Sequence, residues 1–161
     1  ALSHLKNVYL LQENFFEFDN FIIAGTTLWP YISNKFFSGN KCMLSNGFIR
    51  YNNKLWIEPK ITNPISLRQK QWLENIILGN PHKAKIIITH FLPSQKCMDP
   101  KLKFSLTSKS LYSNCDNLLD HTDVWCCGKR VIHKKISGCH IYMNACGYLW
   151  ENTDYKKDFV F

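Results

Sequence analysis

The stretch KIIITHFLPS, residues 85–94, decides the fold of this chain. Its apolar run Ile86–Ile88 is short and β-branched, which predicts a buried strand, and Pro93 marks the loop that follows. The strand therefore ends at His90. In open α/β sheets chemistry takes place at the carboxyl ends of strands, in the loops that follow them. His90 is thus the first candidate functional residue, although a histidine in such a place can also be an ordinary side chain at the end of a core strand.

The segments before this strand predict a strand, a hairpin, a long excursion and a helix. Residues 7–14 have the composition of a strand. The apolar runs FFEF and FIIAGTTLW flank the two-residue turn Asp19-Asn20, which is typical of a β-hairpin. Residues 30–64 carry only weak signals and are expected to be a long excursion. Ser66 has the character of a helix N-cap, and Gly79-Asn80-Pro81 would end that helix.

The segments after His90 predict a second helix and more strands. The second helix is expected at 108–119, and DVWCCG, residues 123–128, is a short apolar strand. The stretch from Val131 to Tyr148 predicts a hairpin with Ser137-Gly138 at its turn, and the tail DFVF predicts a last strand. Together these elements predict one domain over residues 1–161, of class α/β or α+β, with helices on at least one face of a sheet.

Composition excludes some classes of protein. Of 161 residues, 45% are hydrophobic and 14% aromatic, which is enough for a packed core. The sequence has no run of about 18 apolar residues, so we expect no membrane span, and its first residues do not predict a secretory signal. Seven cysteines are an odd number, which favours free thiols and a reducing, intracellular, cytoplasmic location over a disulfide framework. The chain lacks a starting Met and opens as if within an element, so an upstream segment is expected.

The net charge of +8 invites a nucleic-acid interpretation. Lysine far outnumbers arginine, however, and Lys, Asn and Ile are all frequent, as AT-rich coding produces without any partner. Arginine is also the better side chain for bidentate contacts to bases and phosphates. Nucleic-acid binding is therefore possible but not favoured.

Four stretches occur in an order that resembles a known family. They are GTTLW (25–29), THFLPS (89–94), WCCG (125–128) and NACGY (144–148). The chain resembles the calcineurin-like metallophosphoesterases, in particular the small single-domain phosphohydrolases, whose corresponding stretches look like G-x-TLW, V-V-T-H-H-A-P-S, W-x-x-G-H-T-H and N-P-x-G-Y. The resemblance extends from Asn7 to Phe161.

The resemblance implies a two-layer β-sandwich flanked by helices, with two divalent metal ions between the strand ends. The ions, manganese, iron or zinc, would bridge a hydroxide that attacks a phosphoester phosphorus. His90 matches the family's metal-ligating histidine at the junction of strand and loop. The substrate class it implies is a phosphoester.

The chain also departs from the family pattern. After Gly128 the family has Gly-His-x-His, whereas Lys129 and Val131 stand at the two histidine positions here, and neither can ligate a metal. His133 could replace one of them only with a shift of register. The family's earlier ligand boxes, Asp-x-His, Gly-Asp-x-x-Asp and Gly-Asn-His, do not occur; Gly39-Asn40-Lys41 and Gly79-Asn80-Pro81-His82 are near misses.

These departures predict the C-terminal half of such a domain, inactive as a phosphoesterase by itself. Half a domain would leave a sheet edge unpaired, so we expect an upstream segment or a homo-oligomer to cover it. The alternatives are a non-catalytic remnant, a domain that binds phosphate or a nucleotide, and a protein-interaction domain. A basic group would favour phosphate binding, and its members are Lys129, Arg130, Lys134 and Lys135.

A zinc module is a further alternative, because cysteines and histidines gather near the C-terminus (Cys126, Cys127, His133, Cys139, His140 and Cys146). Their spacing is not the Cys-x2-4-Cys of zinc fingers and ribbons. Adjacent residues on a strand point to opposite faces, so Cys126 and Cys127 do not easily share an ion. Core thiols on buried strands are the favoured interpretation.

Overall fold

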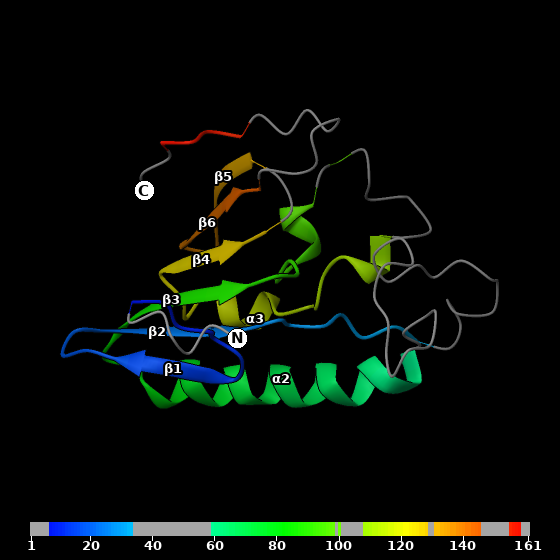
Figure 1. Ribbon diagram of the computed structural model, residues 1–161, viewed down its shortest axis with the longest axis horizontal. Helices are drawn as coiled ribbons and strands as arrows, with labels where there is room; N and C mark the ends of the chain where they lie inside the picture. The colour runs from blue at the N-terminus through cyan, green and yellow to red at the C-terminus, as the bar shows by residue number, and fades with distance from the viewer. Residues whose placement is uncertain are drawn as a thin grey trace.

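The computed structural model describes residues 7–33, 59–98, 100, 108–128, 131–145 and 155–158. Within them the chain is a mixed α/β protein with one six-stranded, mostly parallel sheet and two α-helices (Figure 1). The strands are β1 (Asn14–Glu17), β2 (Phe21–Thr26), β3 (Ala84–Thr89), β4 (Val124–Cys127), β5 (Val131–Ile136) and β6 (Cys139–Asn144). The helices are α2 (Pro59–Gly79) and α3 (Asp116–Leu119). The predicted α/β class is confirmed.

The sheet order is β1-β2-β3-β4-β6-β5. Strands β2, β3, β4 and β6 are parallel to one another, and an antiparallel strand closes each side: β1 beside β2 and β5 beside β6. The four parallel strands therefore end at the same edge of the sheet, called here the carboxyl edge. KIIITHFLPS supplies β3, one of the two central strands.

Both predicted hairpins are confirmed. In the first, the Phe18 amide donates to the Phe21 carbonyl at 2.9 Å and closes the turn between β1 and β2. In the second, Ser137 and Gly138 take φ values of 51° and 88°. Two successive positive φ values are those of the type I′ turn, whose twist matches that of the flanking strands. Because that turn has two residues, it fixes Ile136 opposite Cys139 and sets the register of the whole β5–β6 pair.

The predicted strand over residues 7–14 is wrong, because β1 begins only at Asn14. The Asn14 side chain accepts from the Gln12 amide at 2.8 Å and donates to the Leu10 carbonyl at 3.2 Å. Glu13 takes a φ of 54°, in the left-handed region. This local turn uses backbone groups that a strand would need for a ladder.

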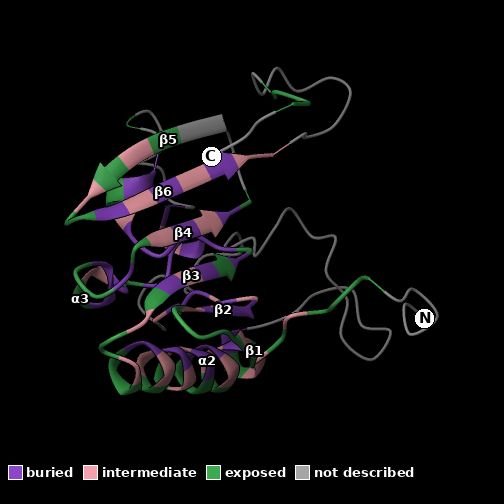
Figure 2. Ribbon diagram, turned by 90° about the vertical axis from the view of Figure 1, so that its left-hand side faces the viewer, coloured by how far each residue is buried: buried purple, intermediate pink, exposed green. Residues whose placement is uncertain are grey.

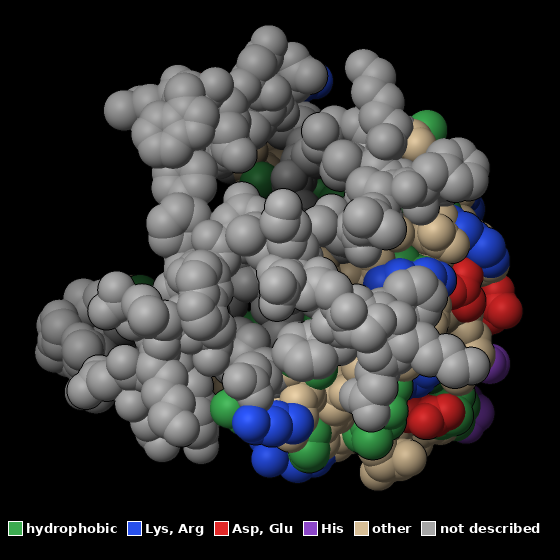
Figure 3. All heavy atoms as spheres, turned by 90° about the vertical axis from the view of Figure 1, so that its right-hand side faces the viewer, with side chains coloured by type: hydrophobic (Ala, Val, Ile, Leu, Met, Phe, Trp, Pro, Cys, Tyr) green, Lys and Arg blue, Asp and Glu red, His purple; other side chains and the backbone are tan. Residues whose placement is uncertain are grey.

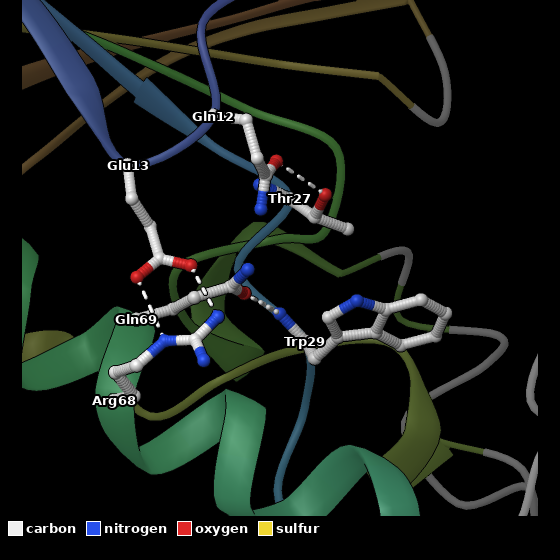
Figure 4. Close-up of polar contacts among 6 residues, drawn as sticks. All are labelled: Gln12, Glu13, Thr27, Trp29, Arg68 and Gln69. Atoms are coloured by element: carbon white, nitrogen blue, oxygen red, sulfur yellow. Dashed lines mark hydrogen bonds and ion pairs between the residues drawn. The ribbon is translucent and has the colours of Figure 1, made fainter.

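Helix α2 begins at Pro59 rather than at Ser66. Proline suits the first position of a helix because its missing N–H would have no partner there. Pro64 lies within the helix. The Asn63 side chain bonds both backbone groups of Ile32, and Gln69 Oε1 accepts from the Trp29 amide at 3.0 Å (Figure 4). These tertiary contacts extend the helix into the predicted excursion over 30–64, of which residues 34–58 lie outside the described part.

The end of α2 agrees with the sequence, whereas the second predicted helix does not form as one piece. Asn80 donates to the Ile76 carbonyl at 2.8 Å just after α2 ends at Gly79. Residues 108–119 instead hold a 3₁₀ turn, Ser108–Ser110, and the short α3. Between them a bridge pairs Tyr112 with Leu92, and Asn114 has a φ of 50°. Of the predicted last strand, DFVF, residues 159–161 lie outside the described residues.

One face of the sheet is covered by the helices. Figure 2 shows α3 on one side of the strands and α2 running beneath β1 and β2. Side chains of α2 and α3, such as Leu73, Ile77 and Leu118, pack with sheet residues that are fully buried: Ala24, Ile87, Trp125 and Ile141. We call this side of the sheet the covered face.

The other side, called here the open face, is only partly shielded. Alternate residues of the same strands form it, and those that the register places side by side are Phe16, Ile23, Ile86, Ile88, Val124, Cys126, His140 and Tyr142. All are half-buried except Ile88, which is 41% exposed. Near β1, Tyr9 contacts Phe16, with ring centroids 4.7 Å apart. No helix of the described chain is long and apolar enough to cross a membrane.

Candidate functional site

The carboxyl edge is where the sequence places candidate chemistry. Thr89 ends β3 beside Thr26 of β2 and Cys127 of β4. His90 and Gly128 come next in their chains, and the Gly128 amide donates to the His90 carbonyl at 3.4 Å. The THFLPS and WCCG stretches, distant in sequence, therefore meet at this edge.

The turn after β3 is held by a short relay of hydrogen bonds. Trp125 Nε1–H donates to Thr89 Oγ1 at 2.9 Å, and Thr89 Oγ1 donates to the Phe91 carbonyl at 2.8 Å. The Phe91 amide donates to the Thr27 carbonyl at 3.2 Å. Trp125 and Phe91 are buried, so this relay lies in a dry environment. It fixes the backbone that leads into and out of His90.

His90 is exposed at the edge, and its ring meets the ring of Phe91 edge-on with centroids 4.9 Å apart. A hollow of about 290 Å³ opens on the neighbouring strand ends. Its lining residues are Ile88, Thr89, Cys126, Cys127, Gly128, Tyr142 and Asn144. The lining is mainly apolar and thiol-bearing, with the phenol of Tyr142 and the amide of Asn144 as its larger polar groups.

The described residues at this edge do not fit the metal pair that the family resemblance implies. A two-metal centre needs carboxylate and imidazole ligands around both ions, and no Asp or Glu is among the described residues that line the hollow. Across the described ranges no three His, Cys, Asp or Glu side chains gather closely enough to hold an ion. Burial raises the pKa of Cys126, and burial raises the pKa of Cys127 well above its usual value.

His133 lies far from His90. It is on β5, opposite Tyr142, and three strand spacings separate β5 from β3 in the sheet order. Neighbouring strands are about 4.8 Å apart, so the spacing across the strands alone separates the two histidines by roughly 14 Å. The structure brings His133 instead to His140, whose Nδ1 is 3.3 Å from His133 Nε2, and to the ring of Tyr142.

The cysteines take the positions expected of core thiols. Cys127 and Cys139 are buried and free, and Cys126 is half-buried on the open face. Burial raises the pKa of Cys139 to about 12. Cys126 and Cys127 point to opposite faces, as the strand period predicts. Cys146 lies outside the described residues.

The predicted basic group is not gathered at the hollow, as far as it is described. Lys134 Nζ donates to the Lys96 carbonyl at 2.7 Å, and Lys134 pairs with Ile141 on the covered face. Lys135 is exposed and pairs with His140 on the other face. Lys129, Arg130 and the side chain of Val131 lie outside the described part. Figure 3 looks at the carboxyl edge, where some described basic side chains gather at the lower rim and others lie beside acidic ones at the right.

Two features escaped prediction from the sequence. One is a larger hollow of about 620 Å³ at the opposite edge, where His82, Asp120 and His121 are among its lining residues. Asp123 there accepts from the Lys85 amide at 2.8 Å, which makes its carboxylate a link between β3 and β4. The other is the contact between His133 and His140. This contact could have been predicted from the two-residue turn at Ser137-Gly138. Such a turn sets the register of the hairpin, and that register places the two histidines diagonally opposite each other on β5 and β6.

Comparison with known proteins gives no match: no family model, no curated protein and no solved structure is significantly similar to this chain.

Proposed function

We propose that this chain is one layer of a metallophosphoesterase-like domain, related to its C-terminal half, and that it does not hydrolyse phosphoesters by itself. The observation that carries the proposal is the meeting of His90 and Gly128 at the ends of adjacent parallel strands. That is the arrangement in which the family's histidine and Gly-His-x-His stretches would approach one another. The match of four stretches in order supports the same relationship.

The open face supports the finer fold assignment. In a two-layer sandwich flanked by helices, each sheet has helices on one face and the second sheet on the other. Here the helices cover one face, and the other carries Ile23, Ile86, Ile88 and Val124 in two neighbouring rows. A second β-layer seated on these side chains would complete the sandwich. The same surface is the specific observation in favour of the alternative function, a protein-interaction domain.

The absence of hydrolysis follows from the donors at the carboxyl edge. His90 supplies one imidazole, and the described residues around it supply no carboxylate to hold or bridge metal ions. A single imidazole cannot fix two divalent cations against water, so no metal-bound hydroxide would be positioned for attack. The described lining of the hollow carries no positive charge that would neutralise a phosphate.

The test is a phosphodiesterase assay with a chromogenic phosphodiester and added Mn²⁺. We expect the wild-type chain, His90→Ala and the control His82→Ala, whose histidine lies at the opposite edge, to give the same rate as buffer. Turnover by the wild type that His90→Ala abolishes and His82→Ala preserves would overturn the proposal of an inactive chain. His82 is an informative control because it removes an imidazole without touching the carboxyl edge.

A further inference from the structure

The open face carries a pair of histidines that the proposed function does not use. His133 on β5 and His140 on β6 are diagonal neighbours across the hairpin, and His133 Nε2 is 3.3 Å from His140 Nδ1. Which of the two nitrogens donates in this contact depends on the tautomer of each ring. A ring nitrogen that carries a lone pair can ligate a metal ion, and here two ring nitrogens lie close enough to share one ion.

The separation of the two nitrogens is the one that a metal ion requires. Zinc binds histidine nitrogens at about 2.0–2.1 Å with tetrahedral geometry, which places two such nitrogens roughly 3.4 Å apart. Binding would therefore need a tilt of the rings rather than a movement of the strands. The type I′ turn at Ser137-Gly138 holds the two strands in this register, so the pair is preorganised by the backbone.

Tyr142 adds a second support. Its ring lies parallel to that of His133, at an angle of 4° with centroids 4.4 Å apart, and this stacking restricts the rotation of the imidazole. His133 is exposed and His140 is half-buried, so the pair lies at the surface of the described part of the chain. Lys135, which pairs with His140 in the register, is a cation on this face and opposes a positive ion.

We propose that His133 and His140 form a binding site for one divalent transition-metal ion of the imidazole-preferring class, Zn²⁺, Ni²⁺ or Cu²⁺. Water completes the coordination, because the described residues supply no third His, Cys, Asp or Glu ligand. Such a two-ligand site is weaker than a three- or four-ligand protein site, and it does not attract Mg²⁺ or Ca²⁺, which prefer oxygen. It lies on β5 and β6, away from His90, and is independent of the proposed phosphoesterase relationship.

The experiment is calorimetric titration of the full chain with NiCl₂ at neutral pH in the presence of a phosphine reductant. We expect one saturable site per chain in the wild type, and its loss in His133→Ala and in His140→Ala. His90→Ala and His82→Ala remove imidazoles elsewhere and are expected to bind as the wild type does. Cys126→Ser tests the nearest described thiol on the open face and is expected to bind normally as well.

A second measurement protects the result against a folding artefact. An ion that bridges β5 and β6 binds the folded state in preference to the unfolded chain, so NiCl₂ should raise the midpoint of thermal unfolding in the wild type but not in the two histidine variants. Circular dichroism without metal should show the same fold in all chains. A wild type without saturable binding, or histidine variants that bind like the wild type, would refute the site. So would binding that is lost in Cys126→Ser and kept in both histidine variants.

Discussion

The two faces of the sheet are built from alternate residues of the same strands, yet they differ in what covers them. Ile87 is fully buried beneath the helices, while its neighbour Ile88 is 41% exposed on the open face. Trp125 is fully buried, and Val124 and Cys126 on either side of it are half-buried. Strand β3 carries three consecutive isoleucines, a pattern typical of strands covered on both faces. The sequence is therefore suited to two covering layers, of which the described residues supply one.

This difference has an energetic meaning. Complete burial of an isoleucine side chain contributes about 1.5–3 kcal/mol relative to leaving it in water. Ile87 obtains this contribution from the helices, whereas Ile88 obtains only part of it. The unused part is available to whatever packs on the open face, which is why that face favours a second layer or a partner.

The largest expected effect comes from truncating the two neighbouring isoleucines separately. Ile87→Ala should lower the free energy of unfolding by about 2–5 kcal/mol, because it leaves a cavity between the sheet and the helices. Ile88→Ala removes the same atoms from a partly exposed position and should cost less than about 1 kcal/mol. Urea denaturation of both variants and the wild type measures the difference.

Equal losses in the two variants would contradict the comparison and would mean that the open face is covered in solution. In that case the loss in Ile88→Ala should depend on protein concentration if a second copy of the chain is the cover. A loss that is independent of concentration would place the cover within the chain itself.

The elements with local signals could be predicted from the sequence. The two hairpins follow from their turn residues, and β3 and β4 follow from short apolar runs. The helix start at Pro59 could not be predicted, because it depends on Asn63 and Gln69 bonding the backbone of Ile32 and Trp29, and no local pattern reveals those contacts. The strand expected over 7–14 failed for a different, local reason: its apolar residues predict a strand, but the Asn14 side chain forms a turn with Gln12 and Leu10.

The candidate site likewise has one part that the sequence predicts and one part that it does not. The position of His90 at a strand end was predictable from KIIITHFLPS and is confirmed. His133 lies three strands away from His90 because β6 lies between β4 and β5 in the sheet. The sequence does not reveal this order, since β6 comes after β5 in the chain. The role of either histidine as a metal ligand stays a prediction.

A smaller effect is expected at Gly25, where the open face is shielded by the segment that precedes β1, residues 7–13, called here the N-terminal segment. A Cβ placed on Gly25 would lie 2.6 Å from Leu11 Cβ and 3.2 Å from the Ile88 carbonyl oxygen. Gly25→Ala should therefore displace Leu11 and lower the free energy of unfolding by about 1–3 kcal/mol. Thermal unfolding of this variant is best compared with Gly79→Ala, since a Cβ there would meet nothing within 4 Å. A Gly25→Ala chain as stable as the wild type would show that Leu11 does not hold this part of the open face.

The smallest effect is expected where an ion pair joins the N-terminal segment to helix α2. Arg68 on α2 bonds both carboxylate oxygens of Glu13, at 2.9 and 2.7 Å (Figure 4). The hydrogen bonds from Arg68 lower the pKa of Glu13 below its usual 4.5. A carboxyl whose pKa is lowered in the folded state contributes stability above its unfolded pKa, and this contribution is lost as the pH falls through the folded value.

Glu13→Gln should therefore lower the free energy of unfolding at pH 7, by less than either change above, because the pair is at the surface and is screened by salt. The difference from the wild type should shrink below pH 4.5 and in high salt. Urea titrations at pH 7 and pH 4 measure this, with Glu17→Gln as the control, since the Glu17 carboxylate pairs with Lys83 at 2.7 Å and is more exposed than Glu13. A Glu13→Gln effect that is the same at both pH values would show that the segment is held by Leu11 and the Gln12–Thr27 hydrogen bonds rather than by charge. The shielding near β1 would then depend on packing and neutral hydrogen bonds, as the contacts of α2 do.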